Sequence, residues 1–168
     1  MRKIKLLSLL AALLFSAGMY VQATVASGTC GTDLAWSLSD DYALTFSGTG
    51  TTMTDYSPAS PAPWDAYKAS ISSITLPDGL YQVGAYAFAG CNSVTTLTVP
   101  ESVSVIGSHA FDMANLASLY VKNHSMPPSR GQEAYSEIFP GHAANHKIYF
   151  HQDMVDWFCQ SWVPSFNI

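Results

Sequence analysis

The sequence repeats itself with a period of 23 residues. At that shift, residues 74–88 fall on 97–111, and apolar positions match apolar positions throughout. Each copy begins with a triplet in which two apolar residues flank a polar one, and further triplets follow at 119–121 and 148–150. A single copy is too short to bury its own apolar side. The copies must therefore stack on one another, which predicts a solenoid.

The triplets are expected to form short strands, because they alternate apolar and polar residues and are rich in β-branched side chains. Pro77 and Pro100 should end the first two strands by removing a backbone donor. The return segments share a glycine, placed where a Cβ would obstruct the backbone, and an Ala-Phe pair that should fill the interior. These are Gly84 with 87–88 and Gly107 with 110–111. A period of about 20–29 residues is typical of leucine-rich repeats, so we expect a β-rich α/β solenoid, a short stack of 22–23-residue repeats.

Both ends of so short a stack need caps, because an open end would expose apolar side chains. Residues 34–38 and 42–46 alternate on either side of a polar turn, which predicts a β-hairpin as the N-terminal cap. A short helix is expected near 64–71. At the other end, Asp153 precedes apolar residues at helical spacing up to Trp162. That pattern predicts a C-terminal cap built from a strand and a helix.

The first 23 residues are predicted to be a secretory signal peptide. Basic residues at positions 2–5 precede an apolar run at 6–15, and Val21 and Ala23 occupy the two positions that a signal peptidase recognises. Cleavage after Ala23 would leave one secreted or extracytoplasmic leucine-rich-repeat domain at 24–168, with no membrane insertion. Its parts are the N-terminal cap at 24–70, the repeats at 71–121, a loop insertion at 122–146 and the C-terminal cap at 147–168.

The charge of the mature chain excludes two classes of partner. Removing the leader leaves twelve acidic and four basic side chains, the latter being Lys68, Lys122, Arg130 and Lys147. A surface with a net charge of −8 would repel phosphate backbones and anionic lipid. We therefore expect neither nucleic acid nor a membrane surface as a partner.

The three cysteines leave two interpretations open. Cys30, Cys91 and Cys159 are an odd number spread thinly over the chain, unlike the dense frameworks of small disulfide-bonded domains. They could be buried thiols that act as small apolar side chains. Alternatively, two of them could form one disulfide and leave a spare thiol.

A zinc site is the first enzymatic alternative. His142 and His146 stand four residues apart, and either His151 or Glu137 could complete a ligand set. Against this, the sequence has no H-E-x-x-H motif, and 140–141 is Pro-Gly, which disfavours a helix. We expect surface histidines and no bound metal, and keep a metal-dependent hydrolase as the third functional hypothesis.

A serine-based triad is the second enzymatic alternative. His109 and Asp112 could be combined with one of many serines, but no G-x-S-x-G motif positions a nucleophile. His109 also falls at the repeat position of Tyr86, on the outside of the stack. We therefore expect no catalytic residues, no enzymatic activity and no cofactor.

The strands should carry the binding surface. In each triplet the flanking residues point inward, so the middle residue and the one before the triplet point outward. Aligned strands then give two outward rows: Thr75, Thr98, Tyr120 and Tyr149, and beside them Ser73, Thr96, Ser118 and Lys147. With strands about 4.7–4.9 Å apart, the rows form a polar, partly aromatic strip about 15 Å wide.

The repeat motifs resemble those of the BspA-like leucine-rich-repeat family of bacterial secreted and cell-surface proteins. The resemblance lies in I-T-L-P-D-G-L-x-x-V-G-A-Y-A-F-A-G-C-N-S-V at 74–94 and T-V-P-E-S-V-S-V-I-G-S-H-A-F at 98–111. The segments 27–50 and 148–162 are similar to those that flank the family's repeats. The chain departs from the pattern at Met113 to Leu116 and at His151.

The resemblance implies a protein that binds another protein, in adhesion to host or neighbouring cells. A glycan-binding module is the alternative, with Tyr120, Tyr149 and neighbouring tryptophans as platforms for sugar rings.

Overall fold

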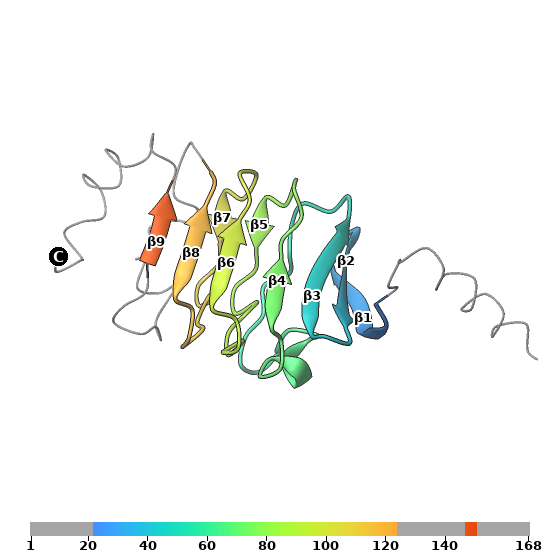
Figure 1. Ribbon diagram of the computed structural model, residues 1–168. Helices are drawn as coiled ribbons and strands as arrows, with labels where there is room; N and C mark the ends of the chain where they lie inside the picture. The colour runs from blue at the N-terminus through green and yellow to red at the C-terminus, as the bar shows by residue number, and fades with distance from the viewer. Residues whose placement is uncertain (1–21, 124–146, 151–168) are drawn as a thin grey trace, which may run out of the picture.

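The computed structural model describes residues 22–123 and 147–150 and shows a β-solenoid (Figure 1). Its strands, in chain order, are β1 (Thr24–Gly31), β2 (Leu34–Ser39), β3 (Ala43–Gly48), β4 (Ser73–Thr75), β5 (Gln82–Val83), β6 (Thr96–Val99), β7 (Val105–Ile106), β8 (Ser118–Val121) and β9 (Lys147–Phe150). Every repeat triplet forms the strand predicted for it. The solenoid of stacked repeats is therefore confirmed.

The strands of the triplets form one side of the solenoid. β6, β8 and β9 are hydrogen-bonded as a parallel sheet, and β4 lies next to β6 in Figure 1. The parallel pairing holds equivalent repeat positions side by side, so Leu97 lies opposite Leu119 and Leu119 opposite Ile148. Leu97 and Leu119 are buried, which places the apolar members of the triplets inside the stack.

The predicted hairpin is confirmed, and its second strand pairs with the first strand of the repeats. β2 and β3 pair antiparallel, with Trp36 opposite Phe46, and β3 then pairs parallel with β4. β1 adds a further antiparallel strand beyond β2, which the sequence analysis did not predict. The order β1-β2-β3-β4 therefore extends the repeat sheet toward the N-terminus (Figure 1).

The return segments pack closely enough that only glycine fits at two positions. A Cβ on Gly84 would collide with the backbone carbonyl of Thr54, and a Cβ on Gly107 would collide with the backbone of Ala85. This confirms the role predicted for both glycines. Behind the strands, β5 and β7 form a short parallel sheet in which Val83 lies opposite Ile106.

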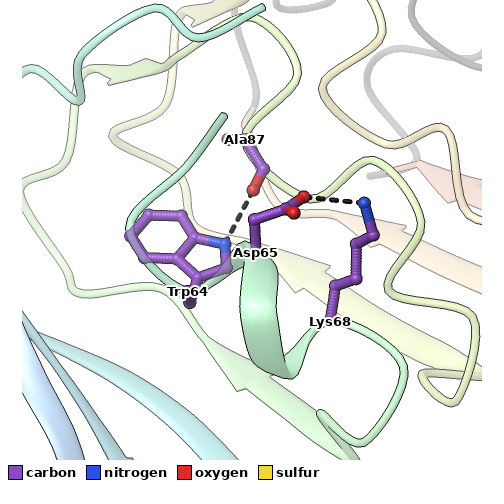
Figure 2. Close-up of polar contacts among 4 residues, drawn as sticks. All are labelled: Trp64, Asp65, Lys68 and Ala87. Atoms are coloured by element: carbon purple, nitrogen blue, oxygen red, sulfur yellow. Dashed lines mark hydrogen bonds and ion pairs between the residues drawn. The ribbon is translucent and has the colours of Figure 1, made fainter. Parts of the chain in front are cut away.

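A column of aromatic rings fills the interior. Phe88 lies between Trp64 and Phe111, at centroid distances of 5.9 Å and 6.0 Å, and both pairs are stacked. Phe46 meets Trp64 edge-on at 5.3 Å. The indole Nε1 of Trp64 donates a hydrogen bond of 2.8 Å to the carbonyl of Ala87 (Figure 2), so the buried polar atom of the column is satisfied. The Ala-Phe pairs therefore fill the interior as predicted.

The α/β component of the predicted fold class is wrong for the residues described. Between 22 and 123 the helical structure consists of one three-residue 3-10 helix, Asp65–Tyr67, where a short helix was expected. The return segments form turns and not helices, because Pro77 and the positive-φ glycines Gly79 and Gly90 interrupt any helical run. The helix expected at 153–162 lies outside the described residues and is not supported.

The two described cysteines are buried free thiols, so the first of the two interpretations is confirmed for them. Burial raises the pKa of Cys30 to about 11 and that of Cys91 to about 12, so both stay protonated at neutral pH. Cys159 lies outside the described residues. Within 22–123 and 147–150, no helix has the length and apolar character needed to cross a membrane.

Candidate partner-binding face

The structure places all eight predicted site residues on one side of the solenoid. Two sets are in register across β6, β8 and β9: Thr98, Tyr120 and Tyr149, and Thr96, Ser118 and Lys147. Ser73 and Thr75 occupy the outward positions of β4. All eight side chains are exposed or half-exposed, whereas Leu97, Leu119 and Val121 between them are buried. We call these eight residues the strand-lined face.

Two tyrosines stand out on the strand-lined face. The rings of Tyr120 and Tyr149 are stacked with centroids 4.6 Å apart and an interplanar angle of 8°. They are 40% and 43% exposed, which is high for side chains of this size in a sheet. Stacking covers one face of each ring and leaves the rest of the pair available to a partner. The stacking also limits the conformational freedom of both side chains in the unbound protein.

The face continues over the hairpin, which the sequence analysis missed. Ser37 on β2 is in register with Thr45 on β3, and Thr45 with Thr75 on β4. The hydroxyl oxygens of Ser37 and Thr45 lie 2.9 Å apart and share a hydrogen bond. A row of hydroxyl-bearing side chains thus runs from the hairpin to Tyr149. The sequence pattern that indicates outward positions was present, because Ser37 and Thr45 alternate with buried residues as the triplet positions do.

The strand-lined face is nearly uncharged, with acidic residues at the ends of its strands. Lys147 is the one charged residue among the eight. Asp78 and Glu101 follow the prolines that end β4 and β6, and Asp41 lies in the turn between β2 and β3. A hydrogen bond from the Ser39 hydroxyl lowers the pKa of Asp41. A partner would therefore meet a hydroxyl-rich strip that is flanked by carboxylates.

The residues considered for catalysis are not brought together into a triad. His109 stacks on Tyr86 with centroids 4.5 Å apart, on a return segment, as its repeat position predicted. Its Nδ1 lies 3.8 Å from Asp112 Oδ2, beyond hydrogen-bond length. The zinc-ligand candidates lie outside the described residues: Glu137, His142, His146 and His151. Among the residues described, no three His, Cys, Asp or Glu side chains gather as a metal site would require.

Comparisons with known proteins give a family and one similar solved structure. A family model described as a BspA type leucine rich repeat region (6 copies) matches residues 66–150, half of the chain. The crystal structure of a leucine-rich repeat protein from Eubacterium ventriosum ATCC 27560, at 2.50 Å resolution, is similar at 20% sequence identity and a TM-score of 0.47. That similarity covers 76% of this chain and 45% of the other, so the chain spans less than half of its relative. No curated protein matches the sequence.

Proposed function

The chain belongs to the BspA-type leucine-rich-repeat family, and from that premise we propose that it is a secreted, non-enzymatic protein whose strand-lined face binds another protein. Stacked repeats create extended surfaces that such proteins use for binding. The observation that carries the proposal is the exposed Tyr120–Tyr149 pair, which lies in a hydroxyl-rich row shared by the hairpin and the repeats. We propose adhesion to host or neighbouring cells as the role of this binding.

A protein fits this face better than a glycan does. A sugar ring needs one ring face to stack on, whereas the exposed surface here joins two stacked rings to the hydroxyl-bearing side chains of the neighbouring strands. Ring edges, phenol hydroxyls and threonine methyl groups suit instead the mixed apolar and hydrogen-bonding contacts of a protein interface. Tyrosine supplies large contact area with few rotatable bonds to immobilise.

The double substitution Tyr120→Ala and Tyr149→Ala should weaken partner binding by at least about 2 kcal/mol, the usual threshold for hot-spot residues. Both side chains are exposed and the buried neighbours Leu119 and Val121 are untouched, so the variant should still fold. The measurement is the affinity for a protein captured by cross-linking from the medium in which the organism lives. Circular dichroism would verify the fold of the variant.

A matched control is Tyr81→Ala. Tyr81 is 49% exposed but lies beside β5, in the other sheet, so its removal should leave partner affinity unchanged. If the folded double variant bound as tightly as the unaltered protein, the strand-lined face would not be the binding site. Equal losses for the control and the double variant would point to the same conclusion.

Export is part of the proposal, and we expect the mature chain to begin at Thr24. The support is the signal-peptide pattern together with the start of β1, which coincides with the residue after the cleavage position. Cleavage there would keep β1 whole and remove the hydrogen bond from the Asp40 N–H to the Ala23 carbonyl and the side-chain bond between Gln22 and Asp41. N-terminal sequencing of the exported protein tests this. An intact Met1 would contradict both cleavage and export.

A further inference from the structure

A hollow of about 390 Å³ lies away from the strand-lined face. The loop at 57–62 forms one side of it, and the return segments of the first two repeats contribute Tyr86 and Asp112. The turn that carries Asp65 and Lys68 also borders it, and none of the eight residues of the strand-lined face does. Its volume falls at the lower end of the range of small-molecule sites.

One side of the hollow is aromatic and held in place. Tyr86 borders the hollow and stacks on His109, whereas His109 does not border the hollow. The part of the Tyr86 ring that faces the hollow is therefore the part that His109 leaves uncovered. Both residues have positive φ angles, 54° and 55°, which are costly for side chains other than glycine. Pro58 and Pro61 add apolar surface to the lining.

The rest of the lining is polar and carries both positive and negative charges. Lys68 Nζ is 2.7 Å from Asp65 Oδ1 (Figure 2), and both side chains are about two-fifths exposed. The stem of Lys68 lies against Gly90, where a Cβ would come within 3.1 Å of Cδ. Asp112 contributes a second, half-exposed carboxylate. The adjacent Trp64 is fixed through its bond to Ala87, which anchors the turn that bears Asp65 and Lys68.

This combination disfavours anions, because the lining has two carboxylates, Asp65 and Asp112, and one ammonium group, Lys68, which is already paired with Asp65. A neutral ligand with several hydroxyl groups suits all three, because hydroxyls donate to carboxylates and accept from an ammonium group. We propose that the hollow binds one neutral sugar ring, with its apolar side against Tyr86 and its hydroxyls toward Asp65, Lys68 and Asp112. This site is separate from the one proposed for a protein partner.

The test is a titration of the mature chain, 24–168, with glucose, galactose, mannose, xylose and N-acetylglucosamine, followed by two-dimensional amide NMR. At least one sugar should give saturable shifts around Tyr86, Gly90 and Asp112. Tyr86→Asn should weaken that binding by at least about tenfold, because it removes the ring. Asparagine tolerates positive φ, so this variant should fold. Asp112→Asn should also weaken binding.

The control variant is Tyr120→Ala, which alters the strand-lined face and should bind the sugar as the unaltered protein does. Absence of saturable shifts for all five sugars would overturn the proposal. So would saturable shifts at the hollow with arginine amide or inorganic phosphate alone, since either would identify a site for a charged ligand. Because protein capture depends on Tyr120 and Tyr149 and sugar binding on Tyr86, either proposal can fail without the other.

Discussion

Replacing Phe88 with alanine should lower the free energy of unfolding by about 3–5 kcal/mol. The ring is fully buried and touches three others: it stacks on Trp64 and Phe111 and meets Phe46 edge-on at 6.0 Å. Its removal would leave a cavity in the middle of the column, where rigid rings on both sides cannot close the gap. An ordinary domain is stable by about 5–15 kcal/mol, so the loss would be a large share of the total.

Urea unfolding measures this loss, followed by tryptophan fluorescence because Trp64 lies against Phe88. The matched control is Tyr81→Ala, which removes an aromatic ring that is 49% exposed and should change stability by no more than about 0.5 kcal/mol. A loss below about 1 kcal/mol for Phe88→Ala would contradict the claim that the ring column forms the core.

The repeat pattern predicted the solenoid because stacking imposes the same environment on equivalent positions. Thr98, Tyr120 and Tyr149 occupy one position in three successive triplets, so parallel pairing places them in one row. The same logic applies to Gly84 and Gly107, which pass close to a neighbouring backbone in successive turns. Periodicity is thus enough to define both the strand-lined face and the tightest backbone contacts.

β1 was missed because its inward residues are too small to give an apolar signal. Gly28 lies opposite Trp36, and a Cβ there would come within 2.9 Å of the indole Nε1. A larger residue at that position would have to displace the ring, and the glycine that avoids this removes the alternation that identifies strands. Val25, its largest apolar residue, is 47% exposed.

The hollow could not be predicted from any motif. Asp65 and Lys68 belong to the segment before the first repeat, whereas Tyr86 and Asp112 belong to the first and second repeats. They meet because the 3-10 turn at 65–67 is placed beside the return segments by the bond from Trp64 to Ala87 (Figure 2). Only the three-dimensional arrangement joins these residues.

The N-terminal segment shares a sheet, ring contacts and backbone hydrogen bonds with the repeats. β3 supplies the parallel neighbour of β4, and Trp64 covers one side of the Phe88 ring. The backbone is shared as well: Met53 donates to the carbonyl of Gln82, and the N–H groups of Tyr81 and Gln82 both donate to Thr51. Loss of this segment would therefore expose apolar surface and leave backbone groups without partners at the same time.

Deleting residues 24–70 should consequently abolish folding, leaving 71–168 as an unfolded or aggregating product. Ile74, Leu80 and Phe88 are at most 7% exposed in the intact protein, and the side of β4 that pairs with β3 would become an open edge. Size-exclusion chromatography and a thermal melt by circular dichroism, with 24–168 as the reference, provide the measurement. A monomeric 71–168 fragment with a cooperative melt would contradict the argument, since the repeats would then carry a sufficient core without Trp64 and the hairpin.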